Sequence, residues 1–157
     1  MSEIFFKQLG LPTPNYFIGI GSGSHTIQTG NIMITFKEVL LKENPEMIIF
    51  VGDVNWMIAC SLDAKKLHFK VAHVQVGLRS FDRYMPAEIN RILTDSILDY
   101  LFVIEKSGMI NLKKEGVFEK KIFFVGNCMV DNLISILTIA YSSNILENFL
   151  LRKRNLL

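Results

Sequence analysis

Short apolar runs recur along the chain and predict the strands of a parallel sheet. The run Met47–Val51 reads Met-Ile-Ile-Phe-Val without interruption, which is typical of a strand that is covered on both faces. Pro45 stands just before this run and ends the preceding helix, so we expect the run to be a central strand. Similar runs predict further strands at residues 17–20, 71–74, 100–103 and 122–125.

Between these runs, apolar residues recur with the period of an α-helix. The stripe within residues 26–43 consists of Ile27, Met33 or Ile34, Val39 and Leu41. The stripe within residues 88–98 consists of Ile89, Ile92, Leu93 and Ile97. We expect both segments to be amphipathic helices that pack on the sheet through these stripes. Residues 2–10 predict a first short helix that starts at Ser2 and stops at Gly10.

Strands that alternate with helices indicate βαβ units, and therefore an α/β fold with a Rossmann-like parallel sheet. In such sheets ligands bind beyond the carboxyl ends of the strands, so the residues that follow each strand are the candidates for a site. The polar residues at these positions are Asp53, Gln75, Arg79, Glu105 and Asn127. Residues 19–24 are glycine-rich, but they match neither the dinucleotide fingerprint nor the phosphate loop of nucleotide-binding proteins.

Composition narrows the class of protein. A chain of 157 residues is at most one domain, and its 50% hydrophobic content excludes a disordered protein. Seventeen Lys and Arg residues against 15 Asp and Glu residues give a net charge of +2, so we expect no nucleic-acid partner. Apolar stretches reach only about half of the roughly 20 residues that span a bilayer, so we expect no membrane segment. The two cysteines lack metal-site spacing, which predicts no metal and a reduced, cytoplasmic setting.

Five segments of the chain carry a resemblance to a known family. They are Gly-Ser-Gly-Ser-His at 21–25 with Gln28, Val-Gly-Asp-Val-Asn at 51–55, the run at 72–83, the run at 85–95, and Phe-Val-Gly-Asn at 124–127. In this order and spacing they resemble the N-terminal domain of the non-hydrolysing UDP-N-acetylglucosamine 2-epimerase family. The resemblance covers residues 1–134, so we expect a partial Rossmann-like domain there and a helical tail at residues 135–157.

The resemblance implies a fold and a reaction. Family members have two Rossmann-like domains in the glycosyltransferase-B arrangement and bind a UDP-sugar between them. The implied reaction removes the C2 proton, eliminates UDP and adds UDP back with the proton on the other face, and it needs no cofactor. In the family a strand, a helix and a second strand come before the point that matches Met1, and a second domain follows Leu133. We expect both parts to be missing here.

The resemblance also assigns candidate catalytic residues. Asp53 matches a family carboxylate; the alternative is an N-cap for the helix that starts at Val54. Gln75 stands where the family has Glu, and Ala87-Glu88 stands where the family has two glutamates, of which the first is catalytic. Neither an amide nor a methyl group transfers protons near neutral pH, and each lost general acid or base costs about 10² to 10⁴ in rate. We therefore expect an impaired or inactive epimerase.

Further positions are candidates for binding the substrate. His25 and Gln28 match a family segment implicated in binding a regulatory UDP-sugar; the alternative is a polar helix start. Arg79, Arg83 and Asn127 are expected to bind the sugar nucleotide, and for the arginines the alternative is a network that orders the loop. His73 is expected to be a buried, hydrogen-bonded histidine.

Two other functions fit the same sequence. A related epimerase that acts on a UDP-diacetamido-uronic acid sugar shares these motifs. The chain could instead be a non-catalytic domain that pairs with a separate half or regulates an intact relative. Because strands resembling the first two of the family are missing, we expect a homo-oligomer or a partner that supplies them.

Overall fold

The structure is a computed structural model, and it describes residue 6 and residues 10–144 of the chain. The first short helix expected at residues 2–10 lies almost entirely outside the described residues, as does the tail beyond residue 144. The helices are α2 (His25–Glu43), α3 (Asn55–Lys66), α4 (Pro86–Ile97), α5 (Lys106–Lys114) and α6 (Cys128–Tyr141). The strands are β1 (Met47–Val51), β2 (Lys70–Val74), β3 (Tyr100–Val103) and β4 (Ile122–Phe124), and a short 3₁₀ turn, Glu119–Lys121, precedes β4.

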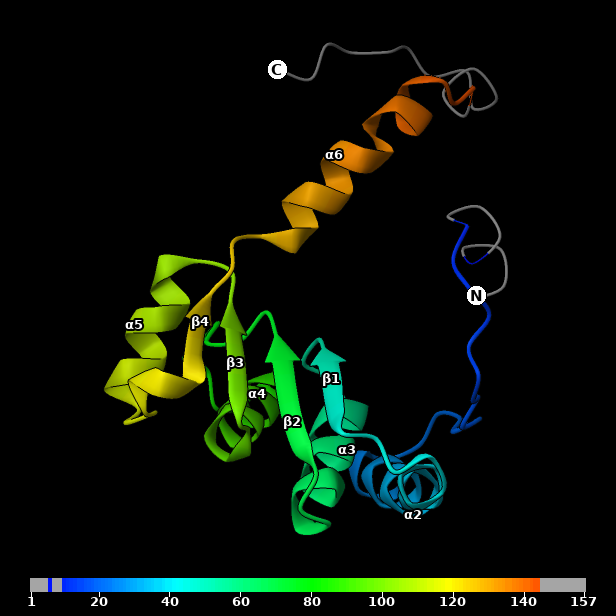
Figure 1. The fold of residues 1–157 in the computed structure, drawn as a ribbon, viewed down its shortest axis with the longest axis vertical. Helices are drawn as coiled ribbons and strands as arrows, with labels where there is room; N and C mark the ends of the chain where they lie inside the picture. Colours follow the sequence, from blue (N-terminus) through cyan, green and yellow to red (C-terminus); the bar gives the residue numbers. More distant parts are fainter. Residues whose placement is uncertain (1–5, 7–9, 145–157) are drawn as a thin grey trace.

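The four strands form one parallel sheet in the order β1-β2-β3-β4 (Figure 1). This confirms the predicted α/β fold and four of the predicted strands. The strand expected at residues 17–20 is wrong, because this segment has no regular secondary structure and joins no ladder with another described segment. The central position expected for Met47–Val51 is also wrong within the described residues, where β1 pairs only with β2 and is an edge strand.

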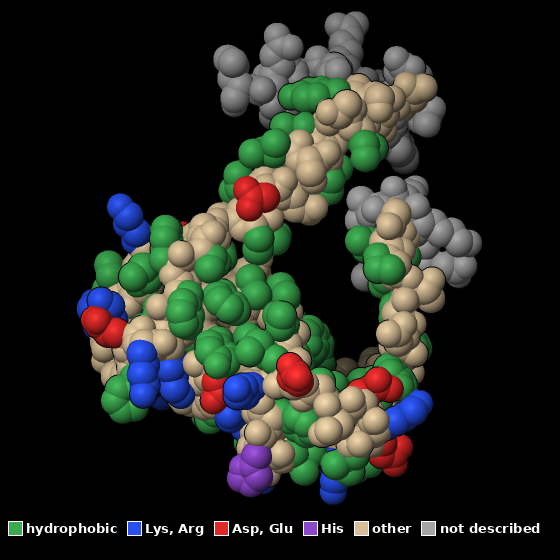
Figure 2. Space-filling view, viewed as in Figure 1, with side chains coloured by type: hydrophobic (Ala, Val, Ile, Leu, Met, Phe, Trp, Pro, Cys, Tyr) green, Lys and Arg blue, Asp and Glu red, His purple; other side chains and the backbone are tan. Residues whose placement is uncertain are grey.

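Strand order fixes where the helices lie. Each strand pairs with the one before it, and parallel connections are right-handed, so α3, α4 and α5 are all placed on one face of the sheet. The other face, which Figure 2 shows, carries a patch of hydrophobic side chains over the strands. Its exposed members include Met47, Ile49, Val51 and Phe123. We call this surface the open face.

The two helices expected to pack through apolar stripes use different faces. In α2 the buried residues are Ile32 and Leu40, whereas Ile27, Ile34 and Leu41 are exposed. The reason is that α2 packs mainly on α3 rather than on the sheet, which selects the face with Ile32, Phe36 and Leu40.

Helix α4 departs further from expectation, because its inward face is polar. Its buried residues are Glu88, Asn90, Thr94 and Asp95. Ile89 and Leu93 of the predicted stripe are exposed. Burying polar side chains is costly unless they have partners, so this face indicates a network of polar contacts between α4 and the strand ends.

Candidate functional site

Asp53 lies at the carboxyl end of β1 and forms an ion pair with α4. Its Oδ2 accepts a hydrogen bond of 2.9 Å from Arg91 Nε and a second, short one from Arg91 Nη2. The N-cap of α3 is Val54, which makes no side-chain capping bond. Asp53 therefore does not cap the helix, and its carboxylate, 39% exposed, faces the strand-end region.

Glu88 is a buried carboxylate that organises the loop after β2. It accepts the backbone N–H groups of Ser80 at 2.9 Å and of Phe81 at 3.1 Å, and Arg91 Nη1 donates to it at 3.2 Å. Burial by itself raises the pKa of this carboxyl, but these hydrogen bonds outweigh burial and lower the pKa below its ordinary value. A group held ionised in this way is suited to ordering a loop, and less suited to exchanging protons near neutral pH.

Gln75 follows β2, and its side chain reaches the start of α6. It adopts φ of +70°, a left-handed conformation that costs a residue with a side chain about 1 kcal/mol or more. Its backbone N–H donates to Phe102 O at 3.1 Å, and its amide Nε2 lies 3.8 Å from Cys128 Sγ. Backbone strain at a strand end is typical of positions where the side chain must point into a site.

A small cavity of about 90 Å³ collects these strand-end residues. Asp53, His73, Gln75, Arg91 and Asp95 are among the side chains that line it. A larger cavity of about 930 Å³ lies beside β1 and is lined mainly by apolar side chains. We assign the candidate site to the smaller cavity, because the titratable groups converge there and the larger cavity has almost none.

Behind this cavity, Asp95 is the centre of a buried network. It accepts from Gly77 N at 3.1 Å and from Arg79 Nη2 at 2.9 Å, and its Oδ1 lies 3.2 Å from His73 Nδ1. His73 Nε2 lies 2.8 Å from the carbonyl oxygen of Gly52, and because a carbonyl only accepts, Nε2 carries a proton. The imidazole therefore fixes the turn that leads into Asp53.

The Arg79 side chain is held in this network by two carboxylates. Its side chain is 1% exposed, and it donates to both oxygens of Glu115 at 2.7 Å in addition to Asp95. These two carboxylates outweigh burial and raise the pKa of the guanidinium. The contacts favour the loop-ordering alternative, and substrate binding by Arg79 stays a prediction.

Gly77 makes a close approach that only glycine allows. Its φ is +78°, and a Cβ atom there would lie 2.5 Å from the carbonyl oxygen of Gly108 in α5. Asn111 Nδ2 donates to Gly77 O at 2.9 Å. The loop after β2 is thus held directly on α5.

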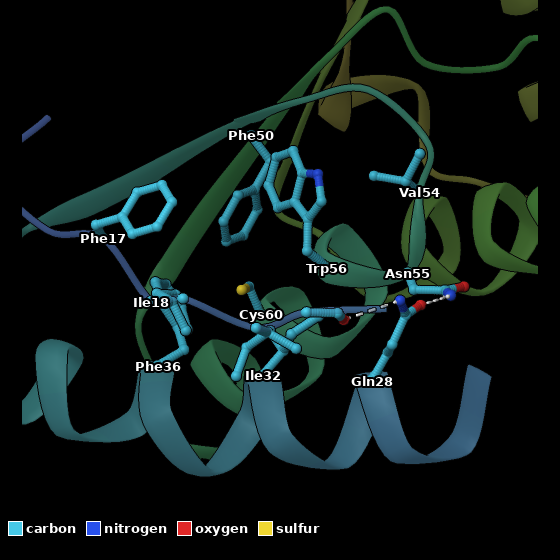
Figure 3. A pocket seen from close by; sticks show the side chains of 13 residues that line it. Phe17, Ile18, Gln28, Ile32, Phe36, Phe50, Val54, Asn55, Trp56 and Cys60 are labelled. Carbon is cyan, nitrogen blue, oxygen red and sulfur yellow. Dashed lines mark hydrogen bonds between the residues drawn. The ribbon is translucent and has the colours of Figure 1, made fainter. Parts of the chain in front are cut away.

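His25 and Gln28 join the site through a second polar chain. Asn55 Nδ2 contacts His25 Nδ1 at 2.7 Å. Asn55 Nδ2 also donates to Gln28 Oε1 at 3.1 Å, and Gln28 Nε2 donates to Gly21 O at 3.3 Å (Figure 3). Asn90 Nδ2 continues the chain from Asn55 Oδ1 to the carbonyl of Asp53. The starts of α2, α3 and α4 are therefore linked by amide side chains.

The other two predicted binding residues lie apart from these networks. Arg83 is exposed in the loop before α4. Asn127 caps α6, because its Oδ1 accepts from Met129 N at 3.0 Å and from Val130 N at 3.4 Å. Binding roles for Arg83 and Asn127 stay predictions.

Several members of the site were not singled out from the sequence. They are Asn55, Asn90, Asp95, Glu115 and Cys128. Asp95 could have been predicted from the sequence. It stands seven residues after Glu88 on the same face of a helix, and two acidic side chains that face a sheet require partners. No sequence pattern predicted Glu115 or Cys128. Glu115 lies 36 residues along the chain from its partner Arg79, and Cys128 lies 53 residues from Gln75.

The cavity is lined by one partly exposed carboxylate, Asp53, which is paired with Arg91, and by the amide side chain of Gln75. Among residues 10–144 no group of three or more His, Cys, Asp or Glu side chains is placed to hold a metal ion. Nor does any helix in this described part have the length and hydropathy needed to cross a membrane.

The parallel sheet with polar groups at its strand ends places the chain among Rossmann-like α/β domains. A family model described as UDP-N-acetylglucosamine 2-epimerase matches residues 1–157. The chain belongs to this family.

Two curated relatives show how similar this chain is to known 2-epimerases. UDP-N-acetylglucosamine 2-epimerase of Methanocaldococcus jannaschii is 51% identical over 140 residues, which is 89% of this chain and 38% of the relative. UDP-2,3-diacetamido-2,3-dideoxy-D-glucuronate 2-epimerase of Pseudomonas aeruginosa is 46% identical over 136 residues, 85% of this chain and 38% of the relative. The chain thus spans about two fifths of the length of these relatives.

Solved structures of 2-epimerases also resemble this chain. The Methanocaldococcus jannaschii enzyme in complex with UDP-GlcNAc and UDP superposes with a TM-score of 0.90 at 49% identity, covering 94% of this chain and 41% of that one. The UDP-N-acetylglucosamine 2-epimerase of Rickettsia bellii superposes with a TM-score of 0.89 at 26% identity, covering 96% and 42%.

Proposed function

We propose that this chain forms part of a UDP-sugar site of a sugar-nucleotide 2-epimerase and that its proton-transfer chemistry is impaired. The complex of the related Methanocaldococcus jannaschii enzyme with UDP-GlcNAc and UDP supports the ligand class. The implied reaction takes the proton from C2, breaks the C1–O bond to release UDP, then re-forms that bond and returns a proton to the opposite face of C2.

One observation carries the impaired chemistry. Gln75 lines the strand-end cavity at the position where the resemblance places a glutamate, and its amide cannot exchange a proton near neutral pH. Ala87 has only a methyl group at the position where the resemblance places the catalytic glutamate. The neighbouring Glu88 accepts hydrogen bonds from Ser80, Phe81 and Arg91. Asp53 remains as the accessible carboxylate.

The experiment has two readouts on the intact chain. A coupled assay for UDP-N-acetylmannosamine is expected to give no rate above the no-enzyme rate. Ligand-observed NMR with UDP-N-acetylglucosamine is expected to show weak binding that the Asp53→Asn variant alters. Turnover by the isolated chain would contradict the impairment, and no saturation transfer to the nucleotide would contradict the site.

A diacetamido-uronate substrate is the second candidate. The 46% identity to the Pseudomonas aeruginosa enzyme is close to the 51% identity to the Methanocaldococcus jannaschii enzyme, so identity alone favours neither sugar strongly. The same NMR experiment with UDP-2,3-diacetamido-2,3-dideoxy-D-glucuronate compares them directly.

A non-catalytic role is supported by surfaces rather than by the site. The free edge of β1 and the open face favour association with another chain, either a second copy or a separate partner.

A cytoplasmic location is also part of this proposal. The two cysteines, Cys60 and Cys128, are both free, which is compatible with a reducing compartment.

A further inference from the structure

Helix α2 is held on the fold mainly by helix α3. Its contact with α3 is far more extensive than its contact with any other described helix or strand. The α2 side of this contact is apolar and includes Ile32, Phe36 and Leu40. On α3, Cys60 belongs to the same contact, because it lines a cavity together with Ile32 and Phe36 (Figure 3). A charge that is buried at this contact therefore acts on the attachment of α2.

Asp63 places a carboxylate on this face of α3. It stands three residues after Cys60, so the two side chains point to the same side of the helix. The residue is only 8% exposed, and its Oδ2 is buried without a hydrogen-bond partner among the described residues. A buried carboxylate without partners is costly while it is ionised and much less costly when it is neutral.

The charges nearest to Asp63 relieve this cost only in part. Lys37 of α2 and Lys66 of α3 favour the ionised carboxylate through space, but neither donates a hydrogen bond to Oδ2. Burial is the larger effect, so the pKa of the Asp63 carboxyl lies above its ordinary value of 3.8. Burial, and after it the charge of Asp63, raise the pKa of the Cys60 thiol to about 12, so this neighbour stays neutral.

The other titratable groups of the packed elements lie in different surroundings. On α2, Glu38, Lys42 and Glu43 are exposed, and His25 contacts Asn55 at the start of α3. Lys65 of α3 pairs with Asp99, and β1 has no titratable residue. The groups of α4 and β2 belong to the candidate site and its network or are exposed, and they are Glu88, Arg91, Asp95, His73 and Lys70.

We propose that Asp63 makes the packing of α2 on α3 respond to pH: the ionised carboxylate loosens this contact, and the neutral carboxyl tightens it. α2 carries His25 and Gln28, and their contacts with Asn55 join α2 to the candidate site. Mild acidification is therefore expected to fix these two side chains more firmly. The proposal depends on the packing of two helices and not on the identity of a ligand, so it and the proposed function can fail independently.

The sign of this effect distinguishes Asp63 from the other carboxylates. Because folding raises the pKa of Asp63, its ionised form destabilises the folded state, and this cost is lost as pH falls through the raised pKa. Glu88 and Asp99 act in the opposite sense, because folding lowers their pKa and their stabilisation is lost in acid. A helix that becomes better protected on mild acidification is therefore a specific sign of Asp63.

Hydrogen exchange of the full chain, measured by mass spectrometry, tests the proposal. Exchange rates of peptides from α2 and α5 are divided by the intrinsic rates at each pH, because the exchange chemistry itself depends on pH. We expect the protection of α2 to rise at least about threefold between about pH 7 and about pH 4.5, and that of α5 to change less than about 1.5-fold.

Variants then assign the response to one residue. Asp63→Asn and Asp63→Ala both remove the buried charge, and Glu38→Gln is the matched control, because Glu38 is an exposed acid of α2. We expect both Asp63 variants to lose the pH response of α2, and Asp63→Asn to protect α2 about threefold better than the unchanged chain does at about pH 7. Glu38→Gln is expected to keep the response.

Four results overturn the proposal. The first is an unchanged chain in which the protection of α2 does not respond to pH. The second is an equal response in both Asp63 variants, which places the titrating group elsewhere. The third is an equal response in α5, which makes the effect one of the whole fold. The fourth is that neither Asp63 variant folds, because the carboxylate would then be needed at the contact.

Discussion

Glu88 shows how a single buried carboxylate can set the shape of the candidate site. It holds two backbone amides of the loop and one guanidinium nitrogen of Arg91, whose other nitrogens hold Asp53. The loop and the accessible carboxylate are therefore positioned by one residue. Sequence alone identified Glu88 and Asp53 as candidates, but it could not show that Arg91 connects them, because this contact spans 38 residues of chain.

Replacing Glu88 by Gln is expected to destabilise the fold by about 2 kcal/mol or more, because one amide oxygen replaces two charged acceptors and Arg91 loses a counter-charge. Chemical denaturation monitored by circular dichroism measures the free energy of unfolding. Glu119→Gln is the control, since the Glu119 side chain is exposed and forms a surface ion pair with Lys113, and it is expected to leave stability unchanged. Equal stability of both variants would contradict the ordering role.

The same carboxyl predicts a dependence of stability on pH. The folded state lowers the pKa of Glu88 from its ordinary value of 4.5. Its contribution is therefore fully present above pH 4.5 and is lost as pH falls through the lower, folded pKa. Thermal melting between pH 6 and pH 3 should show a smaller acid-induced loss for Glu88→Gln than for the unchanged chain, and parallel curves would count against this assignment.

At the scale of elements, the pattern of the sequence predicted which segments are helices and strands better than it predicted which faces they bury. Met47–Val51 and Tyr100–Val103 form strands as expected, because short apolar runs bounded by turns leave few alternatives. The stripe of Ile89 and Leu93 is exposed instead of buried, because Asp95 and Glu88 find partners on the opposite side of α4. Periodicity identifies a helix, but the partners of polar residues decide which side turns inward.

The contact between the loop after β2 and α5 gives a prediction with a matched control. Gly77→Ala combines a φ of +78° with a clash against the Gly108 carbonyl, whereas Gly116→Ala has a similar φ of +80° and no atom within 4 Å of the added Cβ. Gly116→Ala is expected to cost about 1 kcal/mol and Gly77→Ala at least twice as much, by the same denaturation measurement. Equal costs would mean that the loop does not rest on α5.

At the scale of the whole molecule, the most apolar strand lies at the edge of the sheet. Ile49 and Val51 are 62% and 50% exposed, with no charge or proline inside β1 to discourage pairing. The sequence predicted a central strand because β1 has the apolar composition of a central strand. The position of β1 in the sheet depends on which strands lie beside it, and composition does not carry that information.

The isolated chain is therefore expected to dimerise or aggregate. Light scattering coupled to size exclusion at micromolar concentration measures this, and Ile49→Lys should shift the distribution toward monomer while Ile110→Lys should not. A stable, monodisperse monomer of the unchanged chain would show that the edge is blocked.

We propose that this domain has the fold of an epimerase domain and that Gln75 and Ala87 stand where proton-transfer groups have been replaced. A chimera tests it, in which residues 1–134 replace the matching segment of the Methanocaldococcus jannaschii enzyme. It is assayed for conversion of UDP-N-acetylglucosamine with and without Gln75→Glu and Ala87→Glu, and a further version adds Trp56→Ser to remove bulk at the start of α3. We predict that the reverted chimera turns over at least about 10²-fold faster than the unreverted one. Equal rates in the two folded chimeras would contradict the claim.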